Sequence, residues 1–263
     1  MKYLHSRNRA ILREMVSTDF KVRYQGSALG YFWSLLKPLF LFAILYVVFT
    51  YVIPLGKDVE HFAVYLLIGI VFWNFFTEAT MIGAGSVVAR GDLIRKISIP
   101  RYLVVIASSL SALINLGLSL VVVFIFALLN GIVPSVSWLL ILPLAFELYI
   151  FALGISFFLS AAFVKFRDVT YIWEIIIQAG FYASAIIFPL TLVPEMYQKW
   201  FFLNPIVQIV QDARHAVATD TSITIWSTID SWVVIVPFIV IISTVIIGGL
   251  YFKKRSKYFA EDI

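Results

Sequence analysis

The chain has 263 residues, of which 62% are hydrophobic and only 13% are charged, and its mean hydropathy is +0.96. Soluble domains are about half apolar and about a quarter charged, so this composition excludes a soluble enzyme, a disordered protein and a disulfide-rich scaffold. Cysteine is absent, which excludes disulfides, zinc–thiolate sites and a cysteine nucleophile. The composition therefore predicts an integral membrane protein.

Six apolar stretches are long enough to cross a bilayer as helices, which takes about 20 residues each. They cover residues 35–53, 62–79, 104–129, 139–164, 170–188 and 232–252. Each run is continuous rather than alternating with a period of two, which excludes a membrane β-barrel. The sequence therefore predicts an all-α fold with a single transmembrane domain over residues 1–263. Its six spans follow an interfacial segment at 1–34 and precede a cytoplasmic tail at 253–263.

Lysine and arginine residues predict the orientation of these spans. When the N-terminus is placed in the cytoplasm, all but Lys57, Lys199 and Arg214 of the 20 Lys and Arg residues fall on the inner side. This bias predicts that both termini are cytoplasmic. The formal net charge of +5 then reflects contact with anionic lipids of the inner leaflet and not binding to nucleic acid.

Residues 1–34 predict an amphipathic helix that lies in the inner membrane interface. Apolar residues such as Leu12 and Met15 share one helical face, and Arg9 and Arg13 lie on the other. Such a helix is either a simple anchor or one that also contacts a cytoplasmic partner or guides a lipid-linked substrate.

The second inner segment, residues 81–101, is longer than a turn between two spans requires. Isoleucines lie there among basic residues, which predicts a short amphipathic helix that ends before Pro100. This helix is a candidate docking site for a cytoplasmic protein, and the alternative is a solvated loop that only sets orientation. The next inner connection, residues 165–168, is a tight hairpin in which Asp168 is expected to cap the following helix.

The outer segment, residues 189–231, is too apolar for an ordinary loop. Pro189, Pro194 and Pro205 divide it into pieces that are too short to span. Such pieces are typical of re-entrant or interfacial helices at the mouth of a transport pathway. The alternative is a peripheral cap that packs on the bundle.

Glu147 is the one carboxyl group deep in a predicted span, where a charge costs about 2.5–3.5 kcal/mol. We expect it to be protonated, to face water, or to hydrogen-bond a Ser or Asn on a neighbouring span such as Asn115. A proton relay needs several such groups in series, so the sequence favours a structural hydrogen bond.

Aromatic residues make up 17% of the chain, and most are explained by packing and by belts at the membrane surfaces. Flat rings can also stack on sugar faces, so those within spans or near their outer halves are candidates for lining a polysaccharide conduit. The candidate conduit residues are Tyr46, Tyr51, Phe181 and Tyr182.

The sequence contains no phosphate-binding G-x-x-x-x-G-K-[ST] motif and no H-E-x-x-H zinc motif. We therefore expect no catalytic, cofactor-binding or metal site in this chain. Energy for uphill transport would come from a separate subunit.

Several stretches resemble permease subunits of ABC-2 type exporters, with the O-antigen and teichoic-acid polysaccharide group closest. They are KVRYQGSALGYFWSLLKP at 21–38, FRDV at 166–169, FPLTLVPE at 188–195 and FLNPIVQIVQDAR at 202–214. The likeness follows nearly the whole chain in order. One departure is Phe166, at a hairpin position where the family frequently has Tyr.

The resemblance implies a homodimeric permease with two cytoplasmic ATPase subunits, which would bind ATP and Mg²⁺. The substrate would be a glycan on a polyprenyl diphosphate carrier, moved outward across a bacterial inner membrane. The first and fifth spans would line the conduit, and the outer re-entrant helices would gate it. ATPase docking is expected at Arg90, Asp92, Arg95, Lys96, Arg101, Arg167 and Asp168. The carrier diphosphate is expected to meet Arg23, Lys37, Arg90 and Arg95 at the inner mouth.

Other functions remain open on the sequence. The first alternative is a different cargo for an ABC-2 exporter: teichoic acid, capsular polysaccharide without the carrier, a drug or a lipid. A proton-coupled secondary transporter is supported by Glu147 alone. A structural scaffold leaves residues 81–101 and 189–231 without a role, and a membrane enzyme lacks a catalytic constellation.

Overall fold

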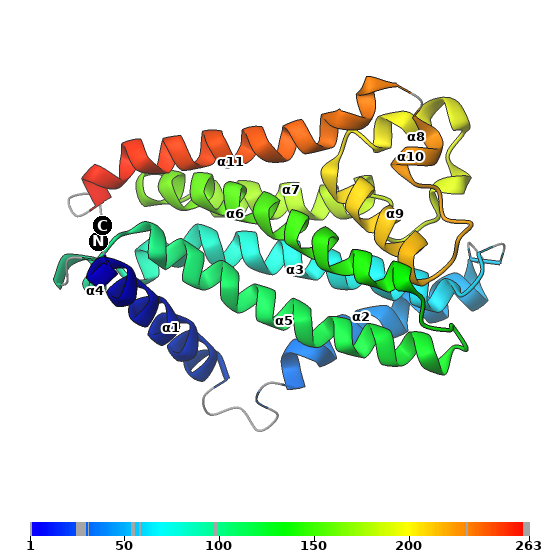
Figure 1. Ribbon diagram of the computed structural model, residues 1–263, viewed down its shortest axis with the longest axis horizontal. Coiled ribbons are helices and arrows are strands. Elements are labelled where there is room, and N and C mark those ends of the chain that lie inside the picture. Colours follow the sequence, from blue (N-terminus) through cyan, green and yellow to red (C-terminus); the bar gives the residue numbers. More distant parts are fainter. Residues whose placement is uncertain are drawn as a thin grey trace.

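A computed structural model shows an elongated bundle of helices that run roughly along its long axis (Figure 1). The structure describes residues 2–24, 30, 32–53, 56–57, 59–96, 99–229 and 231–259, and side chains within α1 only at 7–19, 21 and 22. Within these ranges, five helices are long and apolar enough to cross a membrane: Phe32–Val52, Phe62–Ala89, Tyr102–Leu129, Val136–Lys165 and Trp232–Tyr258.

The first helices are α1 (Lys2–Tyr24), α2 (Phe32–Val47) with its π-helical extension η1 (Val48–Val52), α3 (Phe62–Ala89), α4 (Gly91–Lys96) and α5 (Tyr102–Leu129). The next are η2 (Val136–Leu140), α6 (Ile141–Lys165), α7 (Val169–Ala183), η3 (Leu190–Leu192), α8 (Glu195–Phe201), α9 (Pro205–Val217) and α10 (Ile225–Thr228). The chain then forms η4 (Trp232–Ile235), α11 (Val236–Arg255) and η5 (Ser256–Tyr258). The start of α1, α4 and the end of α11 lie at the same end of the bundle (Figure 1).

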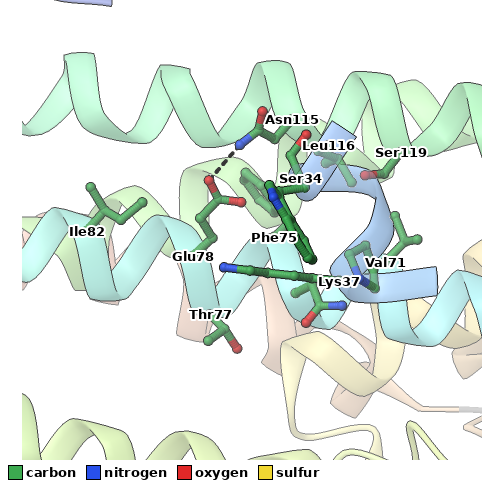
Figure 2. A pocket seen from close by; sticks show the side chains of 13 residues that line it. Ser34, Lys37, Val71, Phe75, Thr77, Glu78, Ile82, Asn115, Leu116 and Ser119 are labelled. Atoms are coloured by element: carbon green, nitrogen blue, oxygen red, sulfur yellow. Dashed lines mark hydrogen bonds between the residues drawn. The ribbon is translucent and has the colours of Figure 1, made fainter. Parts of the chain in front are cut away.

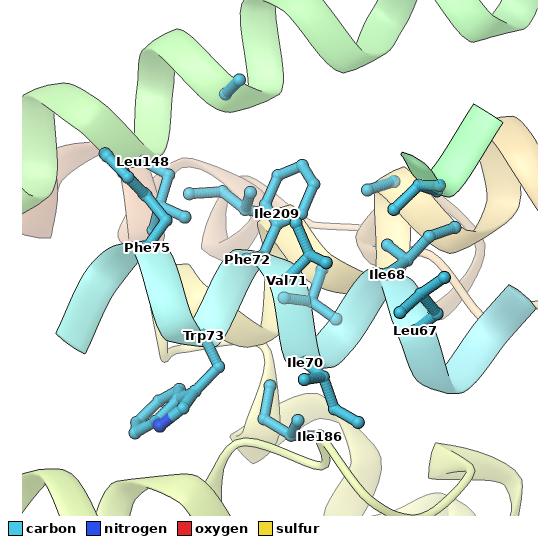
Figure 3. Packing of buried hydrophobic residues seen from close by; sticks show 14 of the residues in the cluster. Leu67, Ile68, Ile70, Val71, Phe72, Trp73, Phe75, Leu148, Ile186 and Ile209 are labelled. Carbon is cyan, nitrogen blue, oxygen red and sulfur yellow. The ribbon is translucent and has the colours of Figure 1, made fainter. Parts of the chain in front are cut away.

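Helix α3 forms the centre of the core because it is apolar on every side. It packs against α2, α5, α6, α7 and α9. Figure 3 shows Phe72 and Phe75 directed to one side of α3, and Ile70 and Trp73 directed to the other. The labelled residues from other elements that pack on it are Leu148, Ile186 and Ile209.

Helices α6 and α11 approach each other closely through two glycines. A Cβ atom added to Gly248 would collide with the backbone carbonyl of Gly154, and one added to Gly154 would meet the backbone of Val245 at 2.9 Å. Small residues at such crossings let helix backbones pack tightly where lipid removes most of the hydrophobic driving force.

Two predicted elements have different lengths in the structure: the second inner segment and the fifth span. Helix α3 does not end at Ala79 but continues to Ala89, because residues 81–89 are mostly apolar and contain no proline, and isolated glycines such as Gly83 and Gly85 are tolerated within a packed helix. The segment predicted at 81–101 therefore begins with the end of α3, followed by the six-residue helix α4. The fifth predicted span, 170–188, is a helix of only 15 residues, α7, because the chain unwinds after Ala183. Ala185 has a positive φ of 49° in this unwound segment.

The outer segment has the predicted succession of short helical pieces. Pro194 is the N-cap residue of α8, and Pro205 is the first residue of α9, positions where a missing N–H costs nothing. The Asn204 side chain caps α9 by accepting a hydrogen bond from the Ile206 N–H at 3.0 Å. Helix α9 packs between α3, α6 and α11 and is buried along most of its length.

Candidate functional site

A cavity of about 660 Å³ lies between α2, α3 and α5 (Figure 2). Trp33 and Lys37 contribute to it from the start of α2, and both are exposed. The buried Phe75 of α3 and Leu116 of α5 supply an apolar part of its wall. Its polar lining residues are Ser34, Lys37, Asn74, Thr77, Glu78, Asn115 and Ser119.

The polar part of this cavity is organised by a contact between two helices. The Asn115 side-chain amide donates a hydrogen bond of 2.7 Å to a carboxyl oxygen of Glu78 (Figure 2). The sequence offered Asn115 as a hydrogen-bond partner for Glu147, and this expectation is wrong. The available signal was that Glu78 and Asn115 lie near the middle of consecutive apolar helices, where a polar group needs a partner.

Glu147 instead meets the outer helix α9. The Gln208 and Asp212 side chains of α9 both lie near enough to act on its carboxyl group. Gln208 also donates from Nε2 to Asp212 at 2.9 Å. Burial raises the pKa of Asp212, and the hydrogen bond from Gln208 opposes that effect. The sequence favoured a structural hydrogen bond between Glu147 and a neighbouring span. The structure places its carboxyl group beside α9 instead, with Oε1 buried and without a partner among the described residues.

Arg214 is the largest fully buried side chain among the described residues. Its guanidinium group donates to the carbonyls of Tyr65 at 3.0 Å, Ala185 at 2.9 Å and Ile186 at 2.6 Å. It also lies 3.7 Å from the centre of the Tyr65 ring, which adds a cation–π contact. Arg214 thus joins α9 to α3 and to the unwound segment that follows α7. The sequence analysis counted Arg214 only as one of three basic residues on the outer side, because a single sequence gives no sign of the carbonyls that surround it.

The predicted docking residues all lie at the end of the bundle that holds the start of α1 and the end of α11, but they differ in their surroundings. Arg90 forms an ion pair with Asp19 of α1 and donates to the Val104 carbonyl at 3.3 Å, so it joins α1 to the core. Arg101 is half-buried at the start of α5. The exposed members of the set are Asp92, Arg95, Lys96, Arg167 and Asp168.

The exposed docking residues make few contacts within the chain. Arg95 pairs with Asp92 at 3.8 Å within α4. Asp168 is the N-cap residue of α7, but its side chain makes no capping hydrogen bond, so the predicted side-chain cap is wrong. A surface pair of this kind contributes little to stability, which leaves these charges available to a partner.

The residues predicted to receive a carrier diphosphate do not form one cluster. Lys37 lines the cavity with Glu78, whereas Arg90 is engaged by Asp19 and Arg95 by Asp92. The side chain of Arg23 lies outside those that the structure describes.

The predicted conduit aromatics divide into two pairs. Tyr46 stacks on Phe42 with ring centres 5.7 Å apart, and Phe181 packs edge-on against Trp73 at 5.8 Å. Tyr51 and Tyr182 are 76% and 64% exposed, respectively. Of the four, Tyr51 and Tyr182 are therefore the ones that can face a pathway or a partner, because Tyr46 and Phe181 pack against the core.

Helices α2 and α7 expose much of their apolar surface. On α7 only Ile177 is buried. Its large exposed apolar residues are Tyr171, Ile172, Ile175, Ile176 and Tyr182. On α2 and η1, the exposed residues include Phe40, Ile44, Val47 and Tyr51. Apolar patches of this extent indicate contact with lipid or with another protein surface.

A comparison with protein families identifies this architecture. The profile described as ABC-2 type transporter matches residues 12–217, from α1 through α9. The chain belongs to the ABC-2 type transporter family. The match covers the cavity, the Arg214 contacts and the inner helix α4, so these features lie within the family's own domain.

Individual ABC-2 transporter relatives share most of their length with this chain. The O-antigen export system permease protein RfbA of Klebsiella pneumoniae is 28% identical over 252 residues, covering 95% of this chain and 94% of the relative. A protein of the same name from Myxococcus xanthus is 26% identical over 77% of this chain and 78% of its own length. The polysialic acid transport protein KpsM of Escherichia coli is 24% identical over 76% of this chain and 78% of its own length.

Proposed function

We propose that this chain is the membrane-spanning permease subunit of an ATP-driven exporter that moves a polysaccharide across a bacterial inner membrane. The observation that carries the proposal is the similarity to an O-antigen export permease along 95% of this chain and 94% of that relative. The cargo in this proposal is a polyprenyl-diphosphate-linked O antigen. The chain itself supplies the path, and ATP with Mg²⁺ is bound and hydrolysed by a separate subunit.

Assembly with two ATPase subunits would use the inner end of the bundle. The exposed charges of α4 and of the 165–168 hairpin lie at this end, next to connections between spans. With both termini in the cytoplasm, this end faces the nucleotide-binding subunits. Closure of the ATPase dimer on ATP would then move α4 and, through Arg90 and Asp19, the interfacial helix α1.

A second copy of this chain would cover the exposed faces of α2 and α7. Both faces carry large apolar side chains, and Tyr51 and Tyr182 project from them. In this arrangement α7 crosses the membrane as the fifth of six spans in chain order. Helices α8 and α9 re-enter the membrane from the outer side. The conduit would form between the copies, lined by exposed aromatics that can stack on successive sugars.

Deletion of the gene tests the proposed function directly. We expect the deletion strain to lose long-chain glycan from its surface and to accumulate lipid-linked glycan inside. Purification of the full chain in mild detergent should also yield a P-loop ATPase in equal amount, detected by mass spectrometry. Normal surface glycan in the deletion strain, with the chain purified alone in several detergents, contradicts the proposal.

Capsular polysaccharide is the second candidate cargo, because the similarity to the polysialic acid transport protein KpsM covers 76% of this chain. The same deletion strain separates the two. Loss of lipopolysaccharide side chains supports O-antigen export, and loss of capsule with normal lipopolysaccharide supports capsule export.

A further inference from the structure

The cavity between α2, α3 and α5 has a polar floor in an otherwise apolar region. Asn115 and Ser119 are only 4% and 9% exposed, and Asn115 donates to Glu78 at 2.7 Å. Buried polar atoms almost always have hydrogen-bond partners. Among the described residues, however, Asn115 Oδ1 and Thr77 Oγ1 have none. The residues that line this cavity therefore offer more hydrogen bonding than the chain itself uses.

The start of α2 provides an aromatic and cationic mouth for the same cavity. Trp33 is 39% exposed, and Lys37 is exposed one helical turn later. An indole ring has an electron-rich face that attracts the weakly positive C–H groups of an apolar or sugar surface. An ammonium group can donate up to three hydrogen bonds. A ligand that has both C–H faces and hydroxyl groups satisfies this combination.

The two charged side chains that line the cavity are of opposite sign, which favours a neutral ligand over an ion of either sign. Glu78 and Lys37 carry opposite charges and line the same space. An ionised carboxylate only accepts hydrogen bonds, so it favours O–H donors and repels phosphate. The volume of about 660 Å³ lies within the range of small-molecule sites.

From these features we infer that the cavity binds one neutral sugar unit of the exported glycan. This inference rests on the proposed export of a polysaccharide, and it adds the place in this chain where the cargo is recognised. Asn115, Thr77 and Glu78 would hydrogen-bond the sugar hydroxyls, and the Trp33 ring would cover a C–H face. The charged carrier diphosphate would bind elsewhere.

Saturation-transfer NMR on the full chain in lipid nanodiscs tests the inference, because it detects weak sugar binding. The probes are glucose, mannose and N-acetylglucosamine, with N-acetylneuraminic acid as the anionic comparison. We expect transfer to the ring protons of at least one neutral sugar, and weaker transfer to the acid. Asn115→Leu and Trp33→Leu should each weaken binding about tenfold. Trp33→Phe keeps a flat ring and should restore most of the affinity.

Matched variants outside the cavity provide the controls. Asn130→Leu changes an exposed asparagine at the end of α5, and Trp226→Leu changes a tryptophan of α10 that is 65% exposed. Both should bind sugar like the unmodified chain, and all variants should elute as single species in size-exclusion chromatography. No transfer from any neutral sugar, preference for the acid, or equal weakening by cavity and control variants overturns the inference.

The deletion strain separates this inference from the proposed function. If deletion removes surface glycan and both Asn115→Leu and Trp33→Leu restore it fully, the sugar site is wrong and export stands. If deletion leaves surface glycan unchanged while sugar binding depends on Trp33 and Asn115, the export function is wrong and the sugar site stands.

Discussion

Helices α3 and α2 are both apolar enough to cross a membrane, yet the chain buries them to very different degrees. Among the most apolar 18 residues of each, 83% are buried in α3 and 11% in the span formed by α2 and η1. Helix α3 contacts five other helices, whereas α2 and η1 pack mainly against α3. An apolar composition therefore predicts that a helix avoids water, but it does not predict whether protein or lipid covers that helix.

The difference between these two helices comes from small and polar residues. Lipid is as apolar as leucine, so helices associate in it through close packing and hydrogen bonds. On α3, Gly69 gives room to the guanidinium of Arg214, and Gly83 gives room to Ser156, which donates to the Ala79 carbonyl at 3.1 Å. On α2, large side chains such as Phe40 point outward instead. Changing the specific contacts of the core should thus have larger effects than changing apolar residues on outward faces.

The largest effect is expected at Arg214. Arg214→Leu would leave the carbonyls of Tyr65, Ala185 and Ile186 without their donor. Each unsatisfied buried group costs about 1–3 kcal/mol, so we expect a loss of at least about 3 kcal/mol. Thermal unfolding in detergent should show a much lower melting temperature. The ammonium group of Arg214→Lys cannot reach all three carbonyls, so its melting temperature should lie between those of Arg214→Leu and the unmodified chain.

Arg167→Leu is the control for Arg214→Leu, since it makes the same change at an exposed arginine between α6 and α7. It should leave the melting temperature almost unchanged. Equal melting temperatures for Arg214→Leu and Arg167→Leu would contradict the assigned role of Arg214 in joining α9 to α3.

A smaller effect is expected where α6 and α11 cross. Gly248→Ala would place a methyl group against the Gly154 carbonyl, and overpacking of this kind costs about 1–3 kcal/mol. The neighbouring Gly249 has open space at its Cβ position, so Gly249→Ala should be neutral or stabilising by up to about 1 kcal/mol. Relative to the unmodified chain, the melting temperature should fall for Gly248→Ala and should stay the same or rise for Gly249→Ala. A shared loss of stability would show that α11 tolerates no methyl group on either face.

A third comparison concerns the contacts through which Arg90 joins α1 to α5. Arg90→Ala removes the pair with Asp19 and the hydrogen bond to Val104, and we expect a loss of about 1–2 kcal/mol. Arg95→Ala removes only an exposed pair within α4 and should cost about 0.3 kcal/mol. Hydrogen exchange should become faster in α1 for Arg90→Ala but not for Arg95→Ala. Unchanged exchange in α1 would argue that its apolar face alone holds it in place.

The smallest effect is expected at Asp212, and it should be stabilising. Because burial raises the pKa of this carboxyl group in the folded state, ionisation costs stability as the pH rises above the unfolded value of about 4. Asp212→Asn removes that cost and keeps an oxygen for the Gln208 amide. Its melting temperature should exceed that of the unmodified chain at pH 7, and the difference should disappear near pH 4. A lower melting temperature at pH 7 would mean that the charge itself is required.

Composition and hydropathy were enough to predict the class of the protein and the order of its parts. Continuous apolar runs predict helices that avoid water, so most of the long helices were located to within a few residues. The outer prolines predicted the divided helices there, because proline cannot continue a helix from its middle. The order of these parts and the quoted stretches also indicated the family, which the matched profile confirmed.

The pairing of polar groups, by contrast, could not be predicted without the folded arrangement of the helices. Periodicity gives the face on which a residue lies but not the depth of its neighbour on another helix, so Asn115 was offered to Glu147 although it bonds Glu78. The end of α7 depends on Arg214, which hydrogen-bonds Ala185 and Ile186 from 28 or more residues further along the chain. No local pattern contains that information, because a buried cation is stabilised by carbonyls that folding alone brings together.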